Sequence, residues 1–198
     1  TGVQTCALPI SKEFLVKTGL SIAKEDDGKG RLIDRFKGRV MFPIHNLSGR
    51  VIGFGGRILK KDEKAAKYVN SPESEVYHKS QVLYGISFAK KSIVHFDNCY
   101  LTEGYTDVIS LHQSGIENAV ASSGTSLTTE QIRLISRYTK NITVLYDADP
   151  AGIKASLRGI DMILEEGLNV KIVLFPQGED PDSFARTHSS SEVYDYLK

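Results

Sequence analysis

The chain has 198 residues, of which 40% are hydrophobic, and its 25 Lys and Arg residues nearly balance its 24 Asp and Glu residues. These values are typical of one soluble globular unit or of two small ones, and they exclude collagen-like, disordered and disulfide-scaffold classes. With two cysteines and no apolar run near the roughly 20 residues that cross a bilayer, we expect a cytoplasmic protein without a membrane partner.

The near-neutral total charge combines two unlike blocks. Residues 31–94 carry 13 Lys and Arg against five Asp and Glu, a net charge of +8, whereas residues 95–198 carry a net charge of −7. A basic block next to an acidic block indicates one surface for a polyanion and another for metal ions. Unevenly distributed solvated side chains explain the same numbers, so the charges alone leave both interpretations open.

The two ends of the chain lack the signals of complete elements. Residues 1–11 show no signal-peptide pattern and no helical or strand period, and we interpret them as an artefact or tag-like segment. The last residues belong to an amphipathic segment without a capping glycine, so we also expect the C-terminus to be cut.

Residues 39–44 and 51–54 read as two antiparallel strands joined by a turn at 46–49. The glycine-rich segment that follows leads to Arg57, where the backbone could approach a ligand closely. Glycines near strand ends also mark bulges, which is the competing interpretation.

A polar stretch rich in lysine then runs to residue 79. Lys67, Tyr68, Asn70 and Lys79 bring positive charge together with aromatic and amide groups. This mixture suits a groove that follows a single nucleic-acid strand, with cations on phosphates and rings available for stacking. A solvated loop explains the lysines equally well, and we give His78 no role.

From residue 98 the pattern alternates between strands and helices. We expect strands at 98–102, 118–121, 142–146 and 170–175, and helices at 105–114, 127–138 and 150–166. Such alternation predicts a parallel sheet with right-handed crossovers. Parallel sheets bind ligands beyond the carboxyl ends of their strands.

Those predicted strand ends are acidic. Carboxylates follow three of the four strands or begin the next helix: Glu103, Asp107, Asp147, Asp149, Asp180 and Asp182. Like charges gathered in one crevice repel each other unless a cation lies among them. Because the candidate ligands are hard oxygen atoms, Mg²⁺ or Mn²⁺ is favoured over Zn²⁺. A single carboxylate such as Asp107 is also explained by the dipole at a helix N-terminus.

Two other motifs also place aspartates in the spacing of Asp147 and Asp149. An EF-hand loop would need oxygen ligands at positions 5 and 12, where this chain has Ala151 and Arg158, so that interpretation fails. A haloacid-dehalogenase-type phosphatase also places Asp-x-Asp after a strand, but normally after the first strand of its domain, and here it follows the third.

Three segments resemble the signatures of a Toprim domain: EGYTD at 103–107, SGT at 123–125 and DADPAG at 147–152. Toprim folds serve several reactions, so this resemblance alone leaves the reaction open. The basic half resembles the bacterial DnaG-type primase core more specifically, through DRFKGRVMFPI at 34–44, GRVIGFGGR at 49–57 and KYVNSPE at 67–73.

The resemblance implies an α/β fold in which a Toprim-like parallel sheet flanked by helices is preceded by a smaller mixed α+β basic subdomain. Its implied limits are residues 12–95 for the basic subdomain, 96–180 for the Toprim domain and 181–198 for the start of a C-terminal helical subdomain. The implied activity is that of a DNA primase, a nucleotidyltransferase that copies single-stranded DNA into short RNA primers from ribonucleoside triphosphates.

By motif, the resemblance implies that Glu103, Asp147 and Asp149 are catalytic. It also implies a metal site for Mg²⁺ or Mn²⁺ that adds three carboxylates, from Asp107, Asp180 and Asp182. The implied DNA- or nucleotide-binding residues are Arg57, Lys67, Tyr68, Asn70 and Lys79. Zinc and the replicative helicase are expected to be bound only by domains absent from this chain.

Two alternatives from other classes stay open. One is another Toprim enzyme, a nuclease or a topoisomerase-like protein, although no tyrosine lies in a supporting nucleophile motif. The other is a Toprim module that binds nucleic acid without catalysis.

Overall fold

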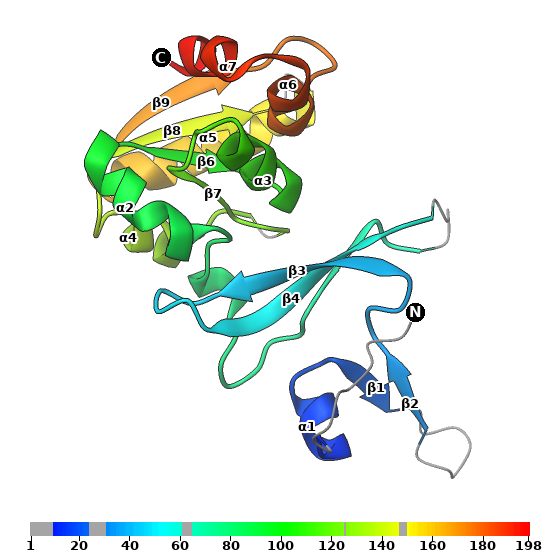
Figure 1. Cartoon of the computed structure of the whole chain (residues 1–198). Helices are drawn as coiled ribbons and strands as arrows, with labels where there is room; N and C mark the ends of the chain where they lie inside the picture. The colour runs from blue at the N-terminus through cyan, green and yellow to red at the C-terminus, as the bar shows by residue number, and fades with distance from the viewer. Residues whose placement is uncertain (1–9, 24–30, 61–64, 125, 147–149) are drawn as a thin grey trace. The chain divides into compact units, whose positions relative to one another are not determined.

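A computed structural model describes residues 10–23, 31–60, 65–124, 126–146 and 150–198 (Figure 1). The chain divides into two compact units, unit 1 with residues 1–44 and 51–78 and unit 2 with residues 45–50 and 79–198. Unit 1 contains two small sheets, and unit 2 contains a four-stranded sheet flanked by helices. The fold class expected from the sequence is therefore confirmed.

Unit 1 begins with a short helix and continues as strands. Its elements are α1 (Lys12–Lys17), β1 (Ser21–Ala23), β2 (Leu32–Asp34), β3 (Arg39–His45), β4 (Val51–Ile58) and β5 (Tyr68–Asn70). Strands β1 and β2 pair antiparallel, and β3, β4 and β5 form a second sheet in that order. Strand β5, which pairs antiparallel with β4, was not foreseen because three residues are too few to show a strand pattern.

The predicted turn between β3 and β4 is confirmed. The side-chain Oδ1 of Asn46 accepts hydrogen bonds from the backbone N–H of Ser48 at 3.1 Å and of Arg50 at 3.0 Å. Gly49 has a φ of 83°, a conformation that glycine adopts without steric cost. An asparagine that binds the backbone two residues ahead is a typical turn initiator, so the sequence signal had a direct physical cause.

The glycines of β4 make room for aromatic rings of unit 1 itself. A Cβ atom on Gly56 would lie 2.6 Å from the Phe36 ring, and one on Gly53 would lie 3.2 Å from the Tyr77 ring. Both rings are buried. Close ring packing therefore gives these two glycines a structural reason.

Unit 2 alternates helices and parallel strands. Its helices are η1 (Lys79–Gln81), α2 (Ile86–Phe96), α3 (Tyr105–Gln113), α4 (Thr129–Ile135), α5 (Pro150–Glu165), α6 (Pro181–Thr187) and α7 (Ser190–Leu197). Its strands are β6 (Cys99–Thr102), β7 (Ala119–Ala121), β8 (Asn141–Tyr146) and β9 (Asn169–Leu174). They lie in the order β7-β6-β8-β9 and are all parallel, with their carboxyl ends at one edge (Figure 1). In the described part of the chain, no helix has the length and apolar character needed to span a membrane.

Each face of this sheet is buried under its own set of helices. Residues of α2, α4 and α5 form one apolar cluster with Leu101 and Val144, whereas residues of α3, α6 and α7 form another with Leu145. Successive strand residues point to opposite faces, which is why Val144 and Leu145 belong to different clusters. Parallel strands covered on both faces are expected to be apolar throughout.

The compact units do not follow the domain limits expected from the sequence. Helix α2 lies in the segment assigned to the basic subdomain, and α6 and α7 lie in the segment assigned to a C-terminal subdomain, yet all three belong to unit 2. The reason is that Ile93, Phe184 and Val193 bury their side chains in the two clusters on the sheet.

The buried side-chain amide of Gln131, on α4, binds the segment 79–82 of unit 2. Gln131 is fully buried, and its Nε2 donates hydrogen bonds to the carbonyl of Val82 at 2.8 Å and that of Lys79 at 3.2 Å. Its Oε1 accepts a hydrogen bond from the N–H of Thr128 at 3.2 Å. One side chain therefore satisfies three backbone groups and fixes the position of the segment that carries Lys79.

The Gln131→Leu variant should unfold more easily, by about 1–3 kcal/mol, because it leaves buried backbone groups without partners. Urea unfolding followed by circular dichroism measures this difference. Glu130→Leu on the same helix is the control, since Glu130 is exposed and its replacement should have a smaller effect. Equal effects of the two substitutions would contradict the role given to Gln131.

The Gly56→Ala variant should be destabilised by about 1–3 kcal/mol, because the new methyl group would overlap the Phe36 ring. Gly53→Ala should cost less, since its methyl group would meet the Tyr77 ring at 3.2 Å. The comparison is made by chemical unfolding of both variants. A larger destabilisation by Gly53→Ala than by Gly56→Ala would show that the distance to the neighbouring ring does not determine the cost of the added methyl group.

Candidate functional site

Three of the predicted nucleic-acid-binding residues form one cluster in unit 1. Arg57 and Tyr68 are paired across β4 and β5, and the Arg57 Cζ lies 5.7 Å from the centroid of the Tyr68 ring. The Lys67 Nζ lies 5.9 Å from the same centroid. We call Arg57, Lys67 and Tyr68 the Arg–Tyr–Lys cluster. Cations at this distance from an aromatic ring are held by the ring's quadrupole.

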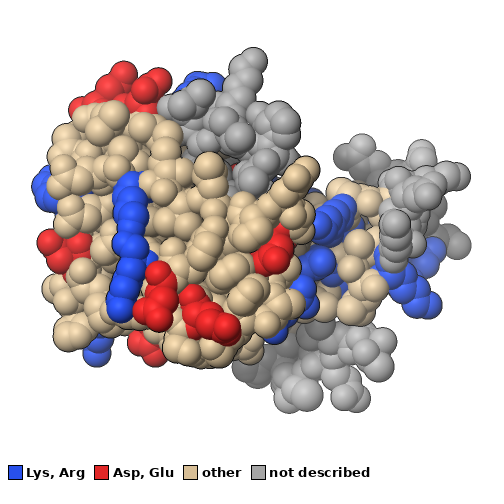
Figure 2. Space-filling view, turned by 90° about the horizontal axis from the view of Figure 1, so that it is seen from above, with Lys and Arg blue, Asp and Glu red and all other residues tan. Residues whose placement is uncertain are grey.

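The Arg–Tyr–Lys cluster is extended by Phe42, whose ring centroid lies 6.4 Å from that of Tyr68. Asn70 ends the same strand, opposite Gly55. Figure 2 shows Lys and Arg side chains gathered on the smaller unit, while side chains of both charges occur on the larger one. Aromatic faces beside basic groups are suited to bases and phosphates of a single strand.

Lys79, the remaining predicted basic residue, lies in η1 and therefore in unit 2. Its backbone is fixed by the bond from Gln131 described above. The structure thus brings Arg57, Lys67 and Tyr68 together in unit 1, whereas Lys79 belongs to unit 2.

On the acidic side, Glu103 follows β6 directly, and its backbone is fixed by the turn after β7. The N–H of Ser123 donates to the Glu103 carbonyl at 3.1 Å, and the N–H of Ser122 donates to the Thr102 carbonyl at 3.3 Å. Ser123 has a φ of 56°, and Gly124 follows with a φ of 86°. A non-glycine residue in this region is uncommon and is often found at functional sites.

Asp107 acts at the start of α3. Its Oδ2 accepts a hydrogen bond from the N–H of Gly104 at 2.8 Å, and the residue is buried. This contact satisfies one of the backbone donors that a helix start leaves open. The neighbouring Tyr105 ring meets that of Tyr84 edge-on at 4.7 Å, and burial raises the pKa of Tyr84.

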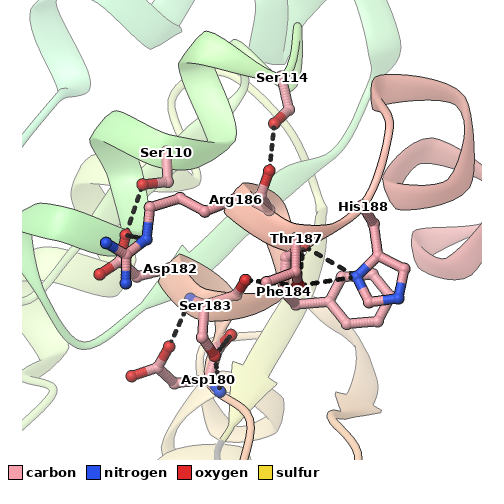
Figure 3. Close-up of polar contacts among 10 residues, drawn as sticks. Ser110, Ser114, Asp180, Asp182, Ser183, Phe184, Arg186, Thr187 and His188 are labelled. Carbon is pink, nitrogen blue, oxygen red and sulfur yellow. Dashed lines mark hydrogen bonds and ion pairs between the residues drawn. The ribbon is translucent and has the colours of Figure 1, made fainter.

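Asp180 and Asp182 shape the start of α6 (Figure 3). Asp180 is the N-cap, and its Oδ1 accepts a hydrogen bond from the N–H of Ser183 at 2.7 Å. The Asp182 Oδ1 accepts one from the Ser110 hydroxyl at 2.6 Å and pairs with the Arg186 Nε at 3.2 Å. Asp182 therefore joins α6 to α3, a contact that sequence reasoning could not anticipate.

The two remaining predicted catalytic carboxylates, Asp147 and Asp149, lie outside the described residues. In the chain they come directly after Tyr146, the last residue of β8. Strand β8 is the parallel neighbour of β6, with Leu101 opposite Val144. Strands β6 and β8, which Glu103 and Asp147 follow in the chain, therefore end at the same edge of the sheet, where parallel sheets bind ligands.

In the part of the chain that the structure describes, no three His, Cys, Asp or Glu side chains gather closely enough to hold a metal ion. Among the described residues, however, the Oε2 of Glu179, just before α6, is buried and has no hydrogen-bond partner, while the residue as a whole is partly exposed. A buried carboxylate oxygen without a donor is costly unless a cation lies nearby. This orphaned oxygen and the oxygen-only donor set fit a hard divalent cation. The sequence pattern by itself gives Glu179 no role.

Cysteine chemistry offers no competing site in the described residues. Cys99 is fully buried in the sheet, and burial raises the pKa of its thiol. It therefore stays protonated and packs as a small apolar side chain.

Two family models match adjacent parts of the chain. The DNA primase catalytic core, N-terminal domain, matches residues 5–90, and the Toprim-like family matches residues 100–185. A DNA primase from Clostridium acetobutylicum is 46% identical over 172 residues, which cover 87% of this chain and 28% of that protein. The chain thus spans less than a third of the length of this relative.

Solved structures agree with these matches. A DNA primase domain from Pseudomonas aeruginosa superposes with a TM-score of 0.85 at 40% identity, covering 93% of this chain and 57% of that one. A DnaG primase catalytic domain bound to single-stranded DNA superposes with a TM-score of 0.84 at 38% identity, covering 96% and 61%. The sequence and fold of both units agree with those of primase cores, and the chain therefore belongs to the bacterial DnaG-type DNA primase catalytic core family.

Proposed function

We propose that this chain is the catalytic-core part of an enzyme that makes short RNA primers on a single-stranded DNA template from ribonucleoside triphosphates. The observation that carries the proposal is the similarity to primase cores along 93% of the chain. The related catalytic domain bound to single-stranded DNA supports the choice of template. The reaction class is nucleotidyl transfer, in which the 3′-hydroxyl of one nucleotide attacks the α-phosphate of the next and pyrophosphate leaves.

In this proposal Glu103, Asp147 and Asp149 hold Mg²⁺ or Mn²⁺ at the carboxyl edge of the sheet. Bound there, the cation supplies charge stabilisation for the attacking and leaving oxygens of the transferred group. Glu103 additionally receives the proton of the attacking hydroxyl on its carboxylate. The turn at 122–124 orients Glu103 by holding its backbone.

The other three carboxylates have a supporting role next to this centre. Asp107 and Asp180 order the first turns of α3 and α6, and Asp182 ties the two helices together. Each carboxylate retains oxygen lone pairs with which it could also bind the cation directly or through water. A metal role for these three residues is therefore part of the proposal.

The Arg–Tyr–Lys cluster binds the template or the nucleotide in this proposal. Arg57 and Lys67 contact phosphates, and the Tyr68 ring offers a stacking surface. Asn70 and Lys79 add polar and cationic contacts on their respective units. A replicative helicase and a zinc-binding domain are proposed as partners of the longer protein only.

Asp147→Asn and Asp149→Asn should each lower primer synthesis at least about 100-fold while leaving binding of single-stranded DNA unchanged. Synthesis is measured as incorporation of labelled ribonucleotides on a single-stranded template with Mg²⁺. Asp161→Asn, an exposed change on α5, is the matched control and should retain full activity. Normal rates in both variants would overturn the assignment. DNA binding without any synthesis by the unaltered chain, with Mg²⁺ or Mn²⁺, would favour a non-catalytic binding module.

Arg57→Ala, Lys67→Ala and Lys79→Ala should each weaken binding of single-stranded DNA. The slope of log Kobs against log salt should become shallower by about 0.7 for each phosphate contact that is lost. Fluorescence anisotropy of a labelled oligonucleotide at several salt concentrations gives this slope. Lys12→Ala on α1 is the control for the loss of one positive charge in unit 1. Unchanged slopes in all three variants would mean that these cations are merely solvated.

A further inference from the structure

A single arginine holds the backbone from which the Arg–Tyr–Lys cluster projects. The Nη1 of Arg39, on β3, donates hydrogen bonds to the carbonyls of Gly56 at 3.1 Å, Ala66 at 2.9 Å and Lys67 at 3.3 Å. These carbonyls come from two segments, the end of β4 and the residues that lead into β5. Arg39 therefore joins the strand that carries Arg57 to the segment that carries Lys67.

The placement of Arg39 is fixed by packing as well as by hydrogen bonds. A Cβ atom on Gly56 would come within 3.1 Å of the Arg39 Cδ, so the stem of the arginine lies directly on this glycine. The guanidinium group is planar and rigid, which suits it to acceptors that approach from different segments. The Gly56 carbonyl is half-buried, so leaving it without a donor would be unfavourable, whereas the bonds to Ala66 and Lys67 are exposed and restrain the backbone mainly through their geometry.

The segment that Arg39 holds is also attached to β4 directly. Strand β5 pairs with β4 over only three residues, Tyr68, Val69 and Asn70. Just before it, the Lys67 carbonyl also accepts a hydrogen bond from the N–H of Ile58 at 3.0 Å. Arg39 therefore adds a restraint from β3 at the point where the chain enters β5.

We propose that Arg39 is a positioning residue: it fixes residues 66–68 against β4 so that Lys67 and Tyr68 face their ligand, and it does not itself bind phosphate. This inference deepens the proposed function and rests on the assignment of Lys67 to a phosphate. The positive charge of Arg39 belongs to the basic block, yet the Arg39 Nη1 is directed at backbone carbonyls of the chain.

The test combines binding and local stability. Arg39→Met, Lys67→Ala and the double variant are compared in their affinity for a single-stranded oligonucleotide over a range of salt concentrations. If Arg39 acts through Lys67, the slope of log Kobs against log salt becomes shallower by about 0.7 in each single variant. In the double variant it becomes shallower by no more than that. Additive changes in the double variant would show that Arg39 contacts phosphate independently and would overturn the proposal. Lys12→Met, which removes one charge from α1, should leave the slope unchanged.

A second measurement needs no DNA. In Arg39→Met, hydrogen exchange of the Ile58 amide should become faster, because its acceptor on Lys67 is held less firmly. The Asn46 amide, which bonds to the Arg50 carbonyl at the other end of the hairpin, is the internal control and should keep its protection. Unchanged exchange at Ile58 would overturn the positioning role.

Arg39→Lys adds a test of charge against geometry. If Arg39 is a positioning residue, Arg39→Lys should restore the salt dependence of DNA binding only to the extent that it restores the protection of the Ile58 amide. A full recovery of the slope while Ile58 remains unprotected would mean that charge alone matters, and would overturn the proposal. If Lys67→Ala leaves DNA binding unaffected, the phosphate assignment fails, whereas the exchange at Ile58 still decides whether Arg39 anchors this segment.

Discussion

The parallel pairing of β6 with a neighbour on each side is the constraint on which unit 2 depends. Strand β6 lies between β7 and β8, and residues of all three strands are buried under helices on both faces. Because the strands are parallel, each must be followed by a loop that leaves the same edge of the sheet. Glu103 and the turn at 122–124 are therefore brought to one edge by pairing alone, and β8 ends at the same edge. A candidate site at that edge follows from the architecture before any side chain is considered.

The helices that begin at this edge use carboxylates for their own order. Asp107 binds the backbone at the start of α3, and Asp180 does so at the start of α6. Asp182 then links the helices through Ser110. Acidic side chains are favourable at helix N-termini, where the backbone N–H groups point outward. The same physical effect that orders the helices thus concentrates negative charge where a metal ion is proposed.

Unit 1 differs from unit 2 in that its candidate binding residues are cations instead of carboxylates. Its glycines admit the Phe36 and Tyr77 rings close to β4, which lets a small sheet bury large side chains. Arg39 ties the end of β4 to the segment before β5, and Tyr68 draws two cations toward its ring. The net charges of +8 and −7 in residues 31–94 and 95–198 therefore accompany two different kinds of surface chemistry.

The sequence by itself determined the alternation of strands and helices, the turn at Asn46, the strand-end carboxylates and the family to which they point. These features depend on local periodicity, on turn chemistry and on motifs of a few consecutive residues, all of which can be read along the chain. Only the tertiary structure decided which polar groups form hydrogen bonds or ion pairs with distant parts of the chain. Ser110 and Asp182 are 72 residues apart, and Arg39 meets the carbonyl of Lys67 28 residues away. Such contacts depend on how elements pack in three dimensions, and no spacing in the sequence encodes them. For the same reason, the sequence marked Asp182 and Lys67 as candidates, but only the fold revealed the contacts that hold them in place.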